Sequence, residues 1–272
     1  MIFKFVAGNN LNNALKYGKK NINNKIIPII NYISENNKNN IIDVFNEYNN
    51  LLNTIDSNYM IALKLSSLNF NETYINNLAD ICKYKNIKLI IDAEDNNNID
   101  NYRKLTNKLI NKYNKKINNN YTIIKTYQMY RKDSLLELYD DIKIFNNANC
   151  FFSSKLVRGA YYNNEYKKGH LYTNKVDTDN NYNLGIIKLN EFSNIENIIA
   201  SHNKESINLA KDLNNNDNKF IIANLMGMNE KFMNNLNTKK AVYIPYGPYY
   251  QMIPYLIRRL YENMDQIKFM IN

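Results

Sequence analysis

The chain has 272 residues, 44% of them hydrophobic, so it is long enough to fold as one large domain around a sizeable core. Its net charge of +10 permits contact with nucleic acid or an acidic membrane, but the lysines are scattered among asparagines and form no dense tract. Nucleic-acid binding is therefore not expected. Two histidines and two distant cysteines offer no metal-ligand cluster, and Cys82 and Cys150 are expected to be free thiols in a reducing compartment.

Asn makes up about a fifth of the chain, and Ile, Lys and Tyr are also abundant. These residues have A/T-rich codons, so we interpret the bias as a property of the genome rather than of the function. Asn-rich stretches fall between the expected helices and strands and are predicted to be surface loops, because Asn tolerates turn conformations. They are 37–40, 96–98, 118–120 and 214–216.

Short β-rich runs alternate with helical segments along the chain. Residues 1–22 are expected to form a strand and helix segment that precedes this alternation, and a helical segment of undefined bounds is expected between Glu165 and Leu189. The expected strands are 26–33, 60–65, 88–92, 121–127, 151–157, 195–200, 220–225 and 241–244. The other expected helices are 41–55, 72–84, 102–113, 134–145, 204–213, 230–236 and a last helix entered at Pro248.

About eight strands alternating with helices predict a parallel α/β sheet, and that number favours closure into a (β/α)8 TIM-type barrel. We therefore expect one domain over residues 1–272. A doubly wound open sheet is the structural alternative, but the sequence lacks the Gly-rich phosphate loop of such sheets. No signal peptide, transit segment or membrane-spanning apolar run is visible, so we expect an intracellular location, either cytoplasmic, at a membrane surface or mitochondrial.

The predicted last helix carries a polar face. Tyr255, Arg258, Arg259 and Glu262 recur at helical spacing and share this face. Adjacent arginines beside aromatic residues suit bidentate binding of a planar anion such as a carboxylate. A solvated amphipathic helix is the alternative interpretation.

The opposite face of this helix is apolar and is expected to pack on the core. Pro254 removes one helical hydrogen bond, so it should kink the helix or delay its start. The apolar face comprises Ile253, Leu256, Ile257 and Leu260.

Polar residues recur at the carboxyl ends of the expected strands, where barrels of this type carry their chemistry. Each has an ordinary structural explanation when taken singly, such as a snorkelling lysine or a loop-capping carboxylate. Their accumulation at one end of successive strands is what indicates a site. Within its strand, Lys64 should point away from Leu63 and Leu65. The residues are Lys64, Asp92, Gln128, Lys155, Arg158, Ser201, His202, Asn203 and Tyr243.

Several motifs, in the same order along nearly the whole chain, resemble proline dehydrogenase, the flavoenzyme family that opens proline catabolism. The most specific are Lys-Leu-Val-Arg-Gly-Ala-Tyr at 155–161 and the block around Arg258-Arg259. The sequences Thr-Tyr-Gln at 126–128 and Tyr-Gly-Pro at 246–248 are similar to those of the eukaryotic-type branch of this family. The resemblance implies a distorted barrel that holds FAD non-covalently at its C-terminal face, which needs no Gly-rich loop. Further matches are 5–8, 63–65, 91–94, 127–130 and 200–203.

The resemblance also implies how a substrate would bind. Arg258 and Arg259 would bind the carboxylate of L-proline, with Lys64 as a third cation. A small anion held by three cations and covered by aromatic rings is well oriented for reaction.

Four more residues complete the implied substrate site. Tyr243 and Tyr255 would pack on the pyrrolidine ring, and Tyr243 favours proline over hydroxyproline. Asp92 would be a hydrogen-bond or charge partner in the pocket. Glu35 matches a carboxylate that pairs with the equivalent of Arg258 as a gate over the substrate.

For the flavin, the resemblance implies that Lys155 lies near the reactive N5 edge and that Gln128 hydrogen-bonds the ring system. A cation at that edge stabilises negative charge on the reduced ring. The other residues expected to line the cofactor are Arg158, Gly159, Ala160, Tyr161, Lys175, Ser201, His202, Asn203 and Glu262.

Three positions depart from the family pattern. Asn174 stands where bacterial relatives often carry arginine, and Tyr162 replaces a tryptophan or leucine. The segment 221–227 lacks the usual glutamine, so Asn224 is left without a role.

The sequence thus predicts an FAD-dependent enzyme that oxidises L-proline to Δ1-pyrroline-5-carboxylate and passes electrons to a membrane quinone, with peripheral membrane contact. The alternative is a catalytically inactive barrel homologue that acts as a binding or interaction protein, which compositional drift toward Asn and Ile would produce. The presence of Lys64, Asp92, Arg258 and Arg259 argues against it, because an idle pocket has no reason to keep converging charges. A basic nucleic-acid binder is the third, least favoured hypothesis.

Overall fold

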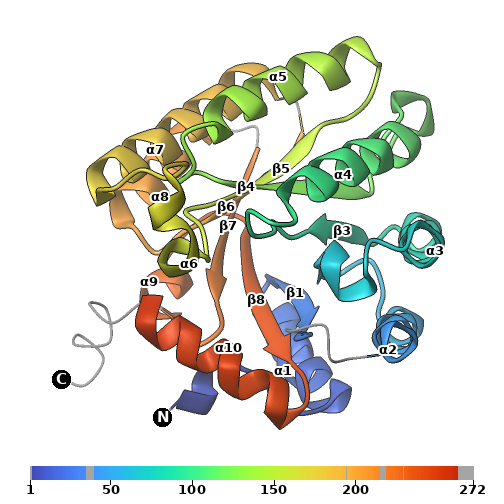
Figure 1. Ribbon diagram of the computed structural model, residues 1–272. Coiled ribbons are helices and arrows are strands. Elements are labelled where there is room, and N and C mark those ends of the chain that lie inside the picture. The colour runs from blue at the N-terminus through green and yellow to red at the C-terminus, as the bar shows by residue number, and fades with distance from the viewer. Residues whose placement is uncertain (1, 35–39, 194, 215–218, 229, 263–272) are drawn as a thin grey trace.

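The computed structural model describes residues 2–34, 40–193, 195–214, 219–228 and 230–262, and it leaves out the side chains of 2–3, 163–164, 231, 234 and 258–262. Eight parallel strands close into a barrel in sequence order, which confirms the predicted fold (Figure 1). The strands are β1 (Ile26–Tyr32), β2 (Met60–Leu63), β3 (Lys88–Ile91), β4 (Ile123–Gln128), β5 (Ser153–Val157), β6 (Asn197–Ala200), β7 (Phe220–Leu225) and β8 (Lys240–Tyr246).

The barrel closes where β1 pairs with both β2 and β8, with Ile29 opposite Met60 and Tyr243. Strands of a parallel barrel are covered on both faces, which explains their nearly continuous Ile-rich runs. Branched side chains fill the interior, among them Ile29, Ile90 and Ile124. Both cysteines are buried free thiols.

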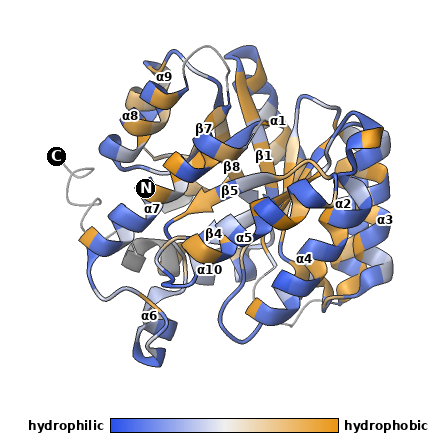
Figure 2. Cartoon of the chain, turned by 90° about the horizontal axis from the view of Figure 1, so that it is seen from above, coloured by the Kyte–Doolittle hydropathy of each residue, from blue (hydrophilic) through white to orange (hydrophobic). Residues whose placement is uncertain are grey.

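Helices surround the barrel and carry hydrophobic and hydrophilic residues on different sides, as the two colours of Figure 2 show. They are α1 (Leu11–Asn23), α2 (Ile41–Thr54), α3 (Glu72–Tyr84), α4 (Ile99–Tyr113), α5 (Ser134–Asn147), α6 (Tyr162–Glu165), α7 (Lys175–Phe192), α8 (Lys204–Leu213), α9 (Glu230–Asn234) and α10 (Tyr249–Glu262). Four 3-10 helices are described as well: η1 (Ile2–Phe5), η2 (Leu65–Leu68), η3 (Lys116–Asn118) and η4 (Tyr166–Lys168).

Most predicted bounds differ from the observed ones by a few residues, and two of the differences change the predicted picture of the fold. The strand expected within residues 1–22 is absent from the described part of that segment, which instead has the 3-10 helix η1 before α1. Strand β2 ends at Leu63, so Lys64 lies after the strand and precedes η2. Side chains end this strand, because Ser67 Oγ donates to the carbonyl of Lys64 at 2.6 Å and Glu94 accepts the amide of Ser66 at 2.9 Å.

The last helix does not take the place of a regular outer helix. Helix α1 packs against β1 and β8, whereas the buried residues of α10 cluster with Val6 and Ile33 near the end of β1. The prediction that Ile253 and Ile257 face the core is therefore wrong: they are 52% and 48% exposed. The buried stripe is instead formed by Gln251, Met252, Tyr255 and Leu256, and the side chain of Leu260 lies outside the described residues.

Pro254 lies inside α10, which begins at Tyr249 and continues beyond the proline. Pro254 is exposed, so the one carbonyl left without a helical partner can be hydrated. The expectation that Pro254 delays the start of the helix is not met.

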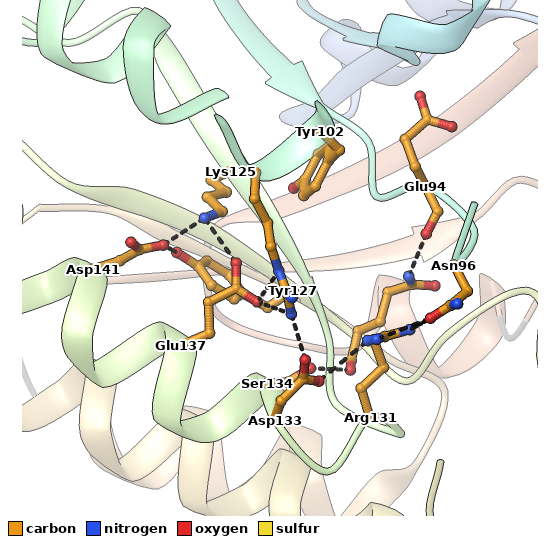
Figure 3. Close-up of polar contacts among 12 residues, drawn as sticks. Glu94, Asn96, Tyr102, Lys125, Tyr127, Arg131, Asp133, Ser134, Glu137 and Asp141 are labelled. Atoms are coloured by element: carbon orange, nitrogen blue, oxygen red, sulfur yellow. Dashed lines mark hydrogen bonds and ion pairs between the residues drawn. The ribbon is translucent and has the colours of Figure 1, made fainter. Parts of the chain in front are cut away.

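Strand β4 is joined to the helix layer by a cluster of buried charges that Figure 3 shows. Lys125 is completely buried and points outward between α4 and α5, where its Nζ lies 2.5 Å from Asp141 and 2.9 Å from Glu137. The hydroxyl of Tyr127 donates to the same oxygen of Asp141 at 2.5 Å. Arg103 forms a further ion pair with Glu137 at 2.6 Å. Because Lys125 and Tyr127 face outward, the residues between and after them, Thr126 and Gln128, face the barrel interior.

Candidate active site

One cavity of about 470 Å³ opens at the carboxyl ends of the strands, within the usual size range of small-molecule sites. Each of the eight strands, or the residues directly after it, contributes to the lining. This follows from parallel topology, because all the carboxyl ends lie at the same end of the barrel.

All the predicted site residues whose side chains are described line this cavity. Glu35 lies outside the described residues, as do the side chains of Arg258, Arg259 and Glu262. The structure therefore brings the predicted residues together, and their individual roles stay predictions. The residues that line the cavity are Lys64, Asp92, Gln128, Lys155, Arg158, Gly159, Ala160, Tyr161, Lys175, Ser201, His202, Asn203, Tyr243 and Tyr255.

Three of these residues, from β5, the end of β3 and β8, form a connected group. Lys155 and Asp92 are 5% and 7% exposed and make a close ion pair. The hydroxyl of Tyr243 donates to the other oxygen of Asp92 at 2.6 Å, and Lys155 Nζ lies 5.1 Å from the centre of the Tyr243 ring. Burial, reinforced by the negative charge of Asp92, holds the pKa of Tyr243 well above its usual 10. Tyr243 is therefore a neutral hydrogen-bond donor in a fixed position.

Lys64, directly after β2, contributes another cation to the cavity, and its Nζ lies 5.6 Å from the centre of the Tyr161 ring. Glu94, only 2% exposed, lies nearby and accepts both the amide and the hydroxyl of Ser66 at 2.9 Å. Burial raises the pKa of Glu94, and the charge of Lys64 acts in the opposite direction. Glu94 thus joins the loops after β2 and β3 beside Lys64. Its carbonyl also accepts the side-chain amide of Gln128 at 2.8 Å.

Arg158 is bound by the protein through most of its donors. Its Nε lies 2.6 Å from Asp179 of α7, its Nη1 donates to Ser201 at 2.6 Å, and its Nη2 donates to Ser206 at 3.0 Å. Asp179 also pairs with Lys175. Burial would raise the pKa of Asp179, but hydrogen bonds from Lys175 and Arg158 outweigh it and lower that pKa. Two cations and one carboxylate leave this part of the cavity positive.

The N-terminus of α8 lies in the same region. Asn203 lines the cavity and caps this ten-residue helix by accepting the amides of Glu205 and Ser206 at 2.9 and 3.2 Å. A helix N-terminus beside Lys175 and Arg158 favours an anionic group.

The buried carboxylate of Glu165 joins several segments at the rim of the cavity. Glu165 has a side chain 3% exposed, accepts the backbone amide of Asn96, accepts the Tyr130 hydroxyl at 3.1 Å and lies 3.5 Å from Arg131. These contacts join the segments that follow β3, β4 and β5. The ring of Tyr130 in turn packs on Gly159, so Glu165 supports the wall of the cavity indirectly.

Sequence reasoning missed Asp179, Glu94, Glu165 and Tyr130. Glu94 and Tyr130 end two of the matching motifs, 91–94 and 127–130, without having been given a role. Asp179 has a local signal, its spacing of four residues from Lys175 in a helix. The contacts of Glu165 and Tyr130 connect residues about 35 positions or more apart, which no local pattern reports.

A closed parallel barrel with a charged cavity at its carboxyl end belongs to the class of barrel proteins that bind small molecules at that face. The family model described as "Proline dehydrogenase" matches residues 14–272. The chain therefore belongs to the proline dehydrogenase family.

Relatives and solved structures agree with this assignment. The "Probable proline dehydrogenase, mitochondrial" of Schizosaccharomyces pombe is 30% identical over 271 residues, covering 82% of this chain and 54% of that protein. "Proline dehydrogenase 1, mitochondrial" of Caenorhabditis elegans is 27% identical, covering 70% of this chain and 34% of the relative. The chain thus spans about half or less of the length of these relatives. The crystal structure of proline utilization A from Bdellovibrio bacteriovorus shares the fold, with a TM-score of 0.82 at 22% identity over 96% of this chain and 32% of that chain.

Proposed function

We propose that the chain is an FAD-dependent proline dehydrogenase, which oxidises L-proline to Δ1-pyrroline-5-carboxylate and passes the electrons to a quinone. Family membership supports the reaction class. The observation that carries the proposal is the convergence of Lys64, Asp92, Lys155 and Tyr243 from four different strand ends on one cavity.

The cavity suits a flavin in three respects. The α8 N-terminus with Lys175 and Arg158 offers a positive region for a pyrophosphate. Gln128 and Lys155 offer polar contacts for the edge of a ring system deeper in the barrel. The buried hydroxyl of Thr126 lines the same cavity without a hydrogen-bond partner among the described residues. When bound there, FAD would supply the acceptor for a hydride from the ring carbon beside the proline nitrogen.

The chain's own residues would bind and orient the substrate. Lys64, with Arg258 and Arg259 three and four positions after Tyr255 in the sequence, would bind the carboxylate. Tyr243, fixed by its hydrogen bond to Asp92, would present its ring to the pyrrolidine, and the buried Tyr255 would cover it. Glu35 would pair with Arg258 above the substrate.

Quinone reduction implies that the protein meets a membrane surface, and we include peripheral membrane contact in the proposal. No helix within the described ranges has the length and apolar character needed to cross a bilayer. The mitochondrial names of the relatives support a mitochondrial location where the host cell has that organelle.

The test is anaerobic addition of L-proline to the purified chain loaded with FAD. We expect bleaching of the visible flavin band and formation of Δ1-pyrroline-5-carboxylate. A protein that binds FAD but is not bleached by L-proline contradicts the proposal, and a colourless protein that takes up no FAD favours the inactive barrel homologue.

Variants of two lysines make the test specific. Lys64→Met should raise the proline concentration needed for half-maximal bleaching by about 10-fold or more, because it removes a charge-assisted contact with the carboxylate. Lys108→Met is the control, since Lys108 forms an exposed ion pair with Glu72 on the outer surface. It should bleach like the unaltered chain.

A further inference from the structure

The hydroxyl of Thr126 is the feature of the cavity that the assigned roles leave unexplained. Thr126 is 3% exposed and lines the cavity, and its Oγ1 has no hydrogen-bond partner among the described residues. A buried polar atom without a partner costs free energy, so native proteins keep few of them. Such an atom on a residue that lines a ligand site is explained if an atom of the bound ligand is its partner.

The backbone of Thr126 is held in place from outside the barrel. Its amide donates to the hydroxyl of Tyr102 at 3.0 Å, and that hydroxyl donates to its carbonyl oxygen at 2.5 Å. Tyr102 belongs to α4, and its side chain is labelled in Figure 3. Its hydroxyl binds the β4 backbone one residue after Lys125, which pairs with Ile91 as the last β4 residue bonded to β3. With Lys125 and Tyr127 bound among the helices, Thr126 cannot turn to find a partner elsewhere.

The position of Thr126 determines what its hydroxyl can reach. Thr126 pairs with Lys155 across β5, and Asp92 follows the β3 residue that pairs with Lys125. Gln128 lies two residues further along β4, about 7 Å closer to the mouth. Thr126 therefore lies on the wall between Gln128 and the Lys155–Asp92 ion pair.

We propose that the hydroxyl of Thr126 hydrogen-bonds a polar atom on the isoalloxazine ring of the bound flavin. The inference rests on the proposed function and adds a contact on a residue to which the sequence analysis gave no role. A hydroxyl both donates and accepts, so it can match either a carbonyl oxygen or a nitrogen of the ring. Because Tyr102 holds the backbone of Thr126 in place, the hydrogen bond requires an adjustment of side chains only on binding.

The test compares FAD binding by the unaltered chain and by Thr126→Val, which keeps the branched shape and removes the hydroxyl. We expect the FAD dissociation constant to rise about 3- to 10-fold, the range of one neutral hydrogen bond. We also expect a shifted flavin absorption band, while the thermal midpoint of the apoprotein rises because an unpaired hydroxyl has been removed. Thr126→Ser, which keeps the hydroxyl, should bind FAD more tightly than Thr126→Ala, and this pair gives the same comparison if the valine variant does not fold.

Thr106→Val is the matched control. Thr106 is completely buried on α4, its hydroxyl also has no partner among the described residues, and it does not line the cavity. Its replacement should raise the thermal midpoint of the apoprotein without changing FAD affinity or the flavin spectrum.

The outcomes separate this inference from the proposed function. If the unaltered chain and Thr126→Val bind FAD equally and with the same spectrum, the inference is overturned, for instance because a water satisfies the hydroxyl, and the proposed function stands. If the unaltered chain binds no FAD, the proposed function fails and the inference fails with it.

Discussion

Gly159 occupies a position that no other residue fits. Its φ of +144° lies in the region that side chains rarely adopt, and a Cβ added there would lie 2.0 Å from the ring of Tyr130. Tyr130 cannot move aside easily, because its hydroxyl is held by the buried Glu165 at 3.1 Å. The glycine thus lets the cavity wall run directly over an aromatic ring.

We predict that Gly159→Ala lowers the unfolding free energy by about 3 kcal/mol or more, since it adds a steric clash to an unfavourable φ. Gly169→Ala provides the control: Gly169 also has a positive φ, +76°, but no heavy atom lies within 4 Å of an added Cβ. It should cost only about 1 kcal/mol. Urea unfolding of both variants measures the difference, and equal losses would show that Tyr130 yields.

Among single residues, the sequence predicts those that line the cavity better than those that hold the lining residues in place. Lys64, Asp92, Lys155 and Tyr243 could be predicted because strand ends of a barrel converge and because family motifs mark them. Glu165 could not, because its role depends on the packing of a loop against two distant segments.

The cluster around Lys125 joins one strand to two helices. Lys125 of β4 pairs with Asp141 and Glu137 of α5, and its Nζ donates to Asn107 of α4 at 2.9 Å. Removing one partner of a buried ion pair leaves the other charge uncompensated. The cluster therefore stabilises the position of β4, which carries Thr126 and Gln128.

We predict that Lys125→Met lowers the unfolding free energy by about 3–5 kcal/mol, because it leaves Asp141 buried without its cation. Lys108→Met should change it by less than about 1 kcal/mol, since the Lys108–Glu72 pair is exposed. Denaturant unfolding provides both values. The double variant Lys125→Met/Asp141→Leu should recover part of the loss, and a double variant less stable than Lys125→Met alone would contradict this explanation.

Element order was predictable from the sequence, and β7, α3 and α8 have the predicted bounds. Hydrophobic periodicity does not predict the ends or the buried face of a helix or strand where contacts with distant residues determine them. Strand β2 stops before Lys64 because Ser67 and Glu94 bind the following backbone, and α10 turns a different face inward because α1 already covers β1 and β8. Such effects depend on partners that are distant in the sequence.

The whole molecule buries many tyrosines, and this predicts an alkaline limit to its stability. At each site burial is the main cause that raises the pKa of Tyr48, Tyr102, Tyr127 and Tyr182 above the ordinary 10. Above pH 10 the unfolded chain loses phenol protons that the folded chain keeps, so the unfolded state binds fewer protons and the unfolding free energy falls as pH rises. Burial lowers the pKa of Lys88 from its ordinary value of 10.5 to about 8. Between these two pH values the unfolded chain keeps a proton that the folded chain has lost, so Lys88 alone makes the unfolding free energy rise with pH.

We therefore expect the unfolding free energy to decrease steadily above pH 10, as measured by urea unfolding at a series of alkaline pH values. The ultraviolet absorbance of phenolate should rise only partly in the folded protein and complete its rise on unfolding. Identical phenolate titrations of the native and urea-unfolded chains would contradict this prediction.

Polar side chains link the rim of the cavity along the side formed by the segments that follow β2 to β6. Polar contacts join the segments after β2, β3, β4, β5 and β6 into one network; they are Ser66–Glu94, Asn96–Glu165, Glu165–Arg131 and Arg158–Ser201. Separating these segments would break buried ion pairs, which raises the free-energy barrier to opening the rim there. Every 1.4 kcal/mol of added barrier slows the opening about tenfold. A ligand should therefore not enter or leave the cavity by separating these segments from one another.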